Sequence, residues 1–193
     1  MNISSNTIHD LQTFTAEFVA SNDIDPVYPV LKSFYSKANM TTEEQLWCTY
    51  LYLAYYNIPS AISVFSRQRL PGSIEQHETK YTIQVERRGL RGGKVSQNVK
   101  SYNAIIGSYT QLDWITEGFT SNPYTNFTIF WERSQKIWGN GRWAAFKWAE
   151  LLQKVHNIPL KSPDLRLKYS TGPLEGFRRL LENGNYTVEE LEK

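Results

Sequence analysis

Cysteine and long apolar runs are the scarcest features of this 193-residue sequence. A single cysteine, Cys48, excludes an internal disulfide, and its place in an apolar, aromatic segment favours a buried thiol over a reactive one. No apolar run approaches the ~20 residues that a bilayer-spanning helix needs. The first residues also lack the basic and then apolar pattern of a signal peptide. These absences favour a soluble, cytoplasmic protein.

Histidine is also rare, with three residues far apart in the sequence: His9, His77 and His156. None is paired with an acidic residue at the spacing of a metal site. His77, next to Glu78, could titrate near neutral pH and act as a base, but a solvated loop histidine is the simpler interpretation. We therefore expect no protein-bound metal and no resident cofactor.

Basic residues are concentrated in one part of the chain. The net charge is only +2, which argues against a strongly basic nucleic-acid-binding protein. Residues 67–100, however, contain eight basic and three acidic residues, a net charge of +5, so the other 159 residues carry −3. Such a stretch would attract a polyanion, although a solvated basic loop is the alternative. The basic residues are Arg67, Arg69, Lys80, Arg87, Arg88, Arg91, Lys94 and Lys100.

Hydrophobic periodicity predicts a mainly α fold. A capping box, Thr42-Glu43-Glu44-Gln45, predicts a helix start. Alternation over 81–85, followed by Arg-Arg-Gly-Leu-Arg-Gly-Gly, predicts a short β or extended insertion around residues 78–94. No repeat or low-complexity linker marks a boundary, so we expect a single domain over 1–193. Helices are expected over about 8–19, 26–38, 42–57, 61–65, 95–107, 109–119, 125–138, 142–155, 173–182 and the tail.

Residues 137–152, IWGNGRWAAFKWAELL, combine two helical patterns with a Gly-Asn-Gly break between them. Glycine tolerates positive φ and close approach of another backbone, so such a turn can aim amides at a phosphate where the second helix begins. The stretch from about 125 to 155 therefore predicts a helix-hairpin-helix, a motif that binds the DNA backbone. The expected DNA contacts are Gly139, Asn140, Gly141, Arg142, Trp143 and Lys147.

An acidic residue follows this hairpin at an informative spacing. Asp164 lies 23 positions after Gly141, where Ser162 could cap a helix, Pro163 fits its first position and Asp164 its first turn. This pattern resembles the helix-hairpin-helix DNA glycosylases, whose active-site acid follows the hairpin similarly. The alternative is an acid that only complements a helix dipole. The chain departs from that superfamily at Trp143, where a lyase offers lysine, and in having no four-cysteine cluster.

Four segments more closely resemble a phage-associated offshoot of that fold. They are YNIPSAISVFSRQRLPG, ERRGLRGGKVSQNVKSY, FWERSQKIWGNGRWAAFKWAELL and the downstream Ser-Pro-Asp. The family is the α-glutamyl/putrescinyl thymine pyrophosphorylases, or amino acid:DNA transferases, and the resemblance spans about 45–180. It implies an enzyme in the infected bacterial cytoplasm that displaces pyrophosphate from pyrophosphorylated 5-hydroxymethyluracil in DNA. The displacing amine would be an amino acid, such as glycine or glutamate, or putrescine, and the sequence does not decide between them.

The resemblance also implies roles for particular residues. Departing pyrophosphate needs fixed cations, for which arginine is well suited. Mg²⁺ could accompany it without leaving a motif. Asp164 would be the general base or the ammonium anchor, with Glu117 and Glu132 as weaker candidates. Aromatic stacking could hold a flipped base, with Trp114 and Trp143 among the candidates. Arg87, Arg88 and Arg91 are the leading pyrophosphate ligands, followed by Arg67, Arg69, Lys94 and Tyr102.

Two other functions remain open on the same residues. A base-excision glycosylase of this fold would use Asp164 to support an attacking water or the developing sugar cation. A noncatalytic DNA-binding protein would use only the hairpin and the basic stretch.

Overall fold

The structure is a computed structural model that describes residues 25–72, 94–180 and 187–191, with isolated positions nearer the N-terminus. The predicted helix over 8–19 therefore falls mainly outside the described residues. So does the predicted insertion around 78–94, apart from Lys94. The chain divides into two compact units, Val27–Pro163 and Asp164–Lys193 with Met1–Pro26. The expectation of a single domain stays a prediction.

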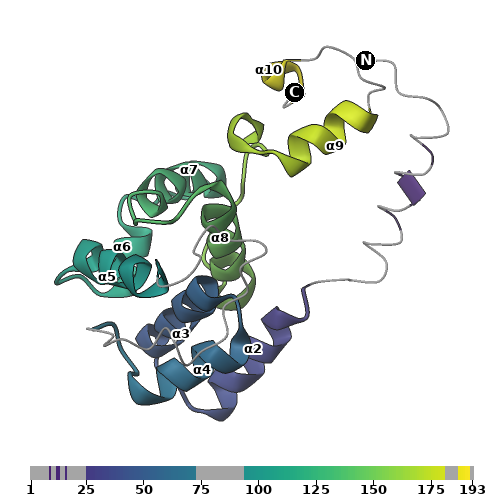
Figure 1. Cartoon of the computed structure of the whole chain (residues 1–193). Helices are drawn as coiled ribbons and strands as arrows, with labels where there is room; N and C mark the ends of the chain where they lie inside the picture. The colour runs from purple at the N-terminus through teal and green to yellow at the C-terminus, as the bar shows by residue number, and fades with distance from the viewer. Residues whose placement is uncertain are drawn as a thin grey trace. The chain divides into compact units, whose positions relative to one another are not determined.

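The described part of the chain is built from helices and contains no strand, which confirms a mainly α fold (Figure 1). A relationship to the DNA glycosylase fold stays a prediction. The larger unit contains α2 (Val27–Lys37), α3 (Thr42–Tyr55), α4 (Ile58–Arg67), α5 (Lys94–Ile106), α6 (Gln111–Thr116), α7 (Pro123–Ser134) and α8 (Arg142–His156). The smaller unit contains the 3-10 helix η2 (Leu167–Tyr169), α9 (Gly172–Leu180) and α10 (Val188–Leu191).

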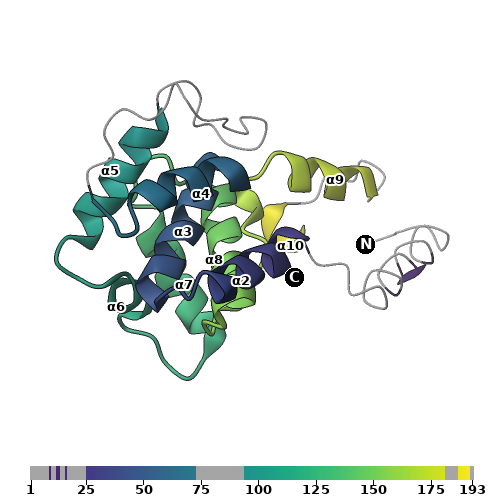
Figure 2. The same cartoon turned by 90° about the horizontal axis from the view of Figure 1, so that it is seen from below.

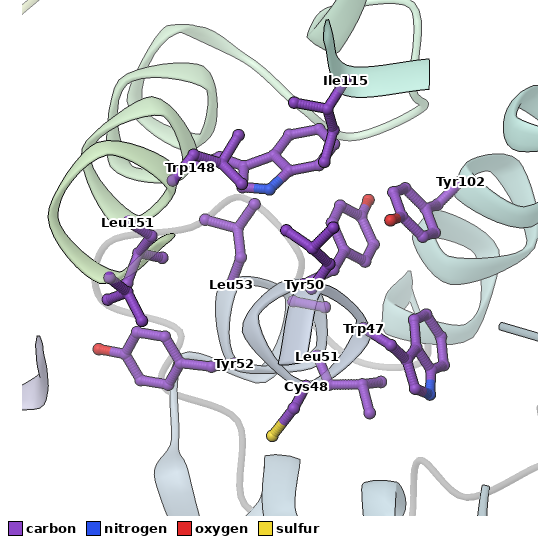
Figure 3. Close-up of a cluster of buried hydrophobic side chains, with 14 of the residues drawn as sticks. Trp47, Cys48, Tyr50, Leu51, Tyr52, Leu53, Tyr102, Ile115, Trp148 and Leu151 are labelled. Carbon is purple, nitrogen blue, oxygen red and sulfur yellow. The ribbon is translucent and has the colours of Figure 1, made fainter. Parts of the chain in front are cut away.

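Helix α3 is the centre of the larger unit and packs against α4, α5, α6 and α8 (Figure 2). Its residues 46–55 are all buried, because the sequence is apolar or aromatic around the whole helix. Aromatic rings fill the space between these helices (Figure 3). The Tyr50 and Tyr102 ring centroids are 3.6 Å apart, and the Trp148 ring lies edge-on to Tyr50 at 5.0 Å.

The capping box of α3 begins one residue earlier than predicted. Thr41 is the N-cap, and its Oγ1 accepts a hydrogen bond from the Glu44 backbone N–H at 3.4 Å. The Glu44 carboxylate in turn accepts the Thr41 N–H at 2.8 Å. Glu43 is thereby left to reach another helix, α6, where its carboxylate accepts backbone N–H groups.

A buried polar chain joins α2, α3 and α8. Thr49 Oγ1 lies 2.7 Å from both the Tyr35 hydroxyl and His156 Nε2. The Tyr35 and His156 rings stack at 5.9 Å. Burial lowers the pKa of His156 to about 4, with a smaller contribution from the charge of Lys32. We therefore expect His156 to be neutral in the folded protein near pH 7.

Acid should destabilise the protein through His156. Its pKa in the unfolded chain is about 6.5, so this contribution to stability is fully present above that pH and is lost as pH falls towards the folded-state value. The loss reaches about 3 kcal/mol at low pH. Urea unfolding at pH 7.5 and 4.5 should show a markedly smaller pH effect in His156→Gln than in the wild type. Equal pH effects in the two proteins would contradict a neutral buried imidazole.

Candidate functional site

The hairpin between α7 and α8 has a longer turn than the sequence predicts. Helix α7 ends at Ser134 and α8 begins at Arg142, so Trp138 lies in the turn rather than in a helix. The Asn140 side chain donates to the Ser134 carbonyl at 3.3 Å, and Gly139 has a φ of 82°. The Asn140 side chain thus pairs with the last carbonyl of α7, and the left-handed Gly139 turns the chain towards α8 instead of continuing the predicted helix through 138.

Helix α5 holds this turn from the side. The Asn98 amide donates to the Trp138 carbonyl at 2.6 Å and to Asn140 Oδ1 at 3.1 Å. Its own Oδ1 accepts a hydrogen bond from the Tyr50 hydroxyl at 2.9 Å. Asn98 therefore braces the turn and connects it to the aromatic core. On the other side, the Trp138 N–H donates to Ser101 Oγ at 2.9 Å. Both backbone groups of Trp138 are therefore fixed by α5.

The same helix brings the end of the basic stretch to the hairpin. Lys94 is exposed and opens α5, four residues before Asn98. At 1.5 Å of rise per residue, this separation is about 6 Å along the helix axis. One cation of the basic stretch therefore lies close to the turn. Arg87, Arg88 and Arg91 lie outside the described residues, so their place at the site stays a prediction.

The arginines at the start of the basic stretch lie at the end of α4 and just after it. Arg67 is the last residue of that helix and is exposed. Arg69 Nε lies 2.6 Å from Glu44 Oε1, and its guanidinium lies 5.4 Å from the Phe65 ring centroid. The hydrogen bond from Arg69 is the main reason that the pKa of Glu44 is lowered. A phosphate at Arg69 would have to compete with this carboxylate, and both pyrophosphate assignments stay predictions.

Two expected contact residues belong to the interior instead. Tyr102 is 0% exposed, and its hydroxyl donates to Gln111 Oε1 at 2.6 Å, so this side chain does not face solvent here and its assignment to pyrophosphate stays a prediction. Lys147 is 9% exposed, and its ammonium donates to the Tyr28 hydroxyl at 2.8 Å and lies 3.2 Å from Glu150. Helix α8 turns this side chain towards α2, so a DNA contact would need the ammonium to leave these partners, and its assignment to DNA stays a prediction.

The other aromatic and acidic candidates differ in burial and in their neighbours. Trp114 is buried, and Trp143 is half-buried with its ring edge-on to Tyr56 at 4.8 Å. Glu117 lies 3.2 Å from Arg133 NH2. Glu132 is exposed. Trp114 is therefore unable to stack on a base without a rearrangement, whereas the stacking role of Trp143 stays a prediction.

Asp164 belongs to the smaller unit and is not in a helix. Its Oδ1 accepts the Arg166 backbone N–H at 2.9 Å and lies 3.1 Å from Arg166 Nε. Arg166 is left-handed, with a φ of 48°, which ends any helical start before η2. The expected first-turn position of Asp164 is therefore wrong, because its side chain forms a local turn instead. The carboxylate is 27% exposed, so solvent still reaches it.

Trp138 is a surface residue that the sequence pattern misses. The sequence has six tryptophans, all within the described residues, and Trp138 is the exposed one at 39%. Its spacing from the aromatic residues of α7 suggests a helical core position. The signal against that interpretation is Gly139, which directly follows it and is a residue typical of turns.

Within the described residues, no group of three His, Cys, Asp or Glu side chains is placed to hold a metal ion. In the same residues, no helix has the length and apolar character needed to cross a bilayer.

A family model described as "Amino acid:DNA transferase" matches residues 19–193, which is most of the chain. Comparisons with curated proteins and with solved structures give no match. The matched range includes the braced hairpin, the basic stretch and Asp164. The chain therefore belongs to the amino acid:DNA transferase family.

Proposed function

We propose that this transferase replaces the pyrophosphate of 5-pyrophosphoryloxymethyluracil in DNA with an amine. The observation that carries the proposal is the hairpin turn fixed by Asn98 and Ser101, with exposed Lys94 one helical turn away. A rigid turn beside a cation can bind the phosphates of the DNA backbone, and membership of the family indicates a transfer reaction on DNA.

The proposed step is a substitution at the 5-methylene carbon of the base. The amine nitrogen forms a new bond to this carbon, while the bond from carbon to the pyrophosphate oxygen breaks and its electron pair leaves with pyrophosphate. The nitrogen then loses a proton to a carboxylate, for which Asp164 is the candidate. Arg87, Arg88 and Arg91 would bind the pyrophosphate more strongly as its charge develops.

Gly141 supports the docking of DNA at the hairpin. Its φ is −90°, which any residue can adopt, and a Cβ built there would meet nothing within 4 Å. Neither backbone conformation nor internal packing therefore requires glycine at this position. A close approach by another molecule would require it, and a phosphate at the start of α8 is such an approach.

Trp138 is the residue that we assign to base stacking in this complex. Its backbone is fixed on both sides while its indole is exposed, so stacking would cost little further ordering. Stacking of a base on an aromatic ring contributes about 1–3 kcal/mol, which offsets much of the cost of unstacking it from DNA.

Trp138→Ala should weaken binding of DNA about 10-fold or more, because the stacking surface is removed. Fluorescence anisotropy with labelled DNA measures this change. Tyr124→Ala is the matched control, since Tyr124 is an aromatic residue of similar exposure (41%) at the opposite end of α7. Equal losses of affinity in the two variants would remove Trp138 from the interface.

The activity itself is tested with DNA that contains pyrophosphorylated 5-hydroxymethyluracil. The DNA is incubated with the protein and a mixture of amines and is then digested to nucleosides, whose masses are measured by mass spectrometry. A base that has lost pyrophosphate and gained the mass of an amine supports the proposal. Loss of the base would instead indicate a glycosylase, and unchanged DNA with retained binding would indicate a noncatalytic protein.

A further inference from the structure

A cavity of about 530 Å³ lies where four segments of the larger unit meet. It is formed by the start of α3, the chain after α4, the end of α5 and the start of α6. Its volume falls within the range of about 300–1,000 Å³ that is typical of small-molecule sites. The described residues that line it are Thr41, Glu43, Leu70, Pro71, Gly72, Asn103, Ile106, Gly107, Tyr109 and Gln111.

The Glu43 carboxylate is held firmly at this cavity. Its Oε2 accepts hydrogen bonds from the Gln111 backbone N–H at 2.8 Å and from Gln111 Nε2 at 3.0 Å, and Oε1 accepts the Leu112 N–H at 3.0 Å. Gln111 is itself fixed, because its Oε1 accepts the Tyr102 hydroxyl from the core. A carboxylate has about four acceptor positions, so three hydrogen bonds leave room for a further donor.

A second residue of the cavity lining carries a buried acceptor without a donor. Asn103 Nδ2 donates to the Gly72 carbonyl, which fixes the orientation of the amide. The other atom of this amide, Oδ1, is buried and has no hydrogen-bond partner within the part of the chain that the structure describes. An unpaired buried carbonyl oxygen is costly, so a ligand with several N–H donors would be favoured here.

The charge and shape of the lining select the class of ligand. Among the described lining residues, Glu43 is the only one with a charged side chain, so these residues favour a cation over pyrophosphate. Leu70, Pro71 and Ile106 supply apolar wall. A compact ammonium on a short hydrocarbon chain matches both features, whereas the carboxylate of an amino acid would meet no cation among these residues.

We propose that this cavity binds the amine donor through its ammonium group and favours a primary alkylamine or diamine. This inference rests on the proposed transferase function, which requires an amine substrate, but it concerns a different part of the molecule from the hairpin. Glu43 and Asn103 Oδ1 accept the ammonium hydrogens, and the apolar residues contact the methylene groups.

Calorimetric titration of the full chain without DNA tests the site, with putrescine, butylamine, glycine and acetate as probes. Putrescine and butylamine should bind, and glycine and acetate should bind at least 10-fold more weakly. Glu43→Gln keeps the shape and an acceptor for α6 but removes the charge, and should weaken alkylamine binding at least 10-fold. Asn103→Ala, which leaves the Glu43 contacts intact, should weaken it about 5-fold or more.

Glu175→Gln is the control, since it removes an exposed carboxylate of α9 that is paired with Arg179. Alkylamine affinity that is the same in all four proteins would overturn the proposal, as would a preference for glycine. The readout is independent of DNA. If the wild type transfers amines and Glu43→Gln binds and transfers alkylamines equally well, the assignment of the amine site to this cavity is wrong and the proposed function stands. If alkylamines bind as expected but no transfer occurs, the proposed function fails instead.

Discussion

Asn98→Ala should produce the largest combined loss of stability and DNA affinity of any single change near the hairpin. The truncation removes the partner of the Trp138 carbonyl, of Asn140 Oδ1 and of the Tyr50 hydroxyl. Each buried hydrogen bond that loses its partner costs about 1–3 kcal/mol, and three are lost here, so we expect a total of about 3 kcal/mol or more. For a chain of this size, such a loss lowers Tm by about 6–12 °C.

The loss of DNA affinity has a separate physical cause. Without Asn98, the Trp138 carbonyl has lost this hydrogen bond and the turn is more mobile. DNA binding must then order the turn, and this entropic cost makes the free energy of binding less favourable. Anisotropy titrations at a temperature well below the lowered Tm measure this loss in folded protein.

Gln97→Ala is the control for this experiment, because Gln97 is an exposed neighbour on the same helix. Ser101→Ala should have an intermediate effect, since it removes only the acceptor of the Trp138 N–H. If Asn98→Ala matched Gln97→Ala in both Tm and DNA affinity, α5 would have no role in holding the turn.

Asp164→Asn should lower the single-turnover rate of amine transfer by at least 100-fold. A general base typically contributes about 10²–10⁴-fold, and asparagine cannot accept the proton. The fold should be retained, because the Asn Oδ1 can still accept the Arg166 N–H that Asp164 accepts at 2.9 Å. The ion pair with Arg166 is lost, but partly exposed pairs contribute only about 0–1 kcal/mol.

Thermal melting beside the rate measurement separates chemistry from folding for this variant. Asp113→Asn is the matched control, since Asp113 is an exposed acid in the first turn of α6. A variant at Asp164 that transfers amines at the wild-type rate would exclude the carboxylate from the mechanism. A slow variant with an equally lowered Tm would assign Asp164 to the local turn alone.

Most helices follow directly from the periodicity of the sequence. The predicted segments over 26–38 and 95–107 correspond to α2 and α5 within a residue or two, because each has apolar residues on one face. Periodicity is a weaker guide at helix ends, where single capping side chains determine the residue at which the helix begins or ends. The misplacement of Trp138 in a helix and the one-residue shift of the capping box at Thr41 both have this origin.

The environment of individual polar residues depends on tertiary contacts that no local pattern contains. Asn98 is buried because the hairpin turn, 40 residues later in the chain, supplies a carbonyl for it. Lys147 is buried because Tyr28, 119 residues earlier, accepts its hydrogen bond. The orientation of Glu43 likewise depends on a distant segment, because its carboxylate accepts backbone N–H groups at the start of α6. Sequence alone therefore identifies the hairpin but not the brace or the cavity.

Hydrogen exchange followed by mass spectrometry, with and without DNA, shows whether the hairpin turn and the start of α5 form the DNA-binding surface. We expect slower amide exchange in peptides covering residues 135–143 and 94–101 when DNA is bound, with α2 unchanged as the internal reference. Saturating DNA that leaves exchange in both of these peptides unchanged would contradict this expectation.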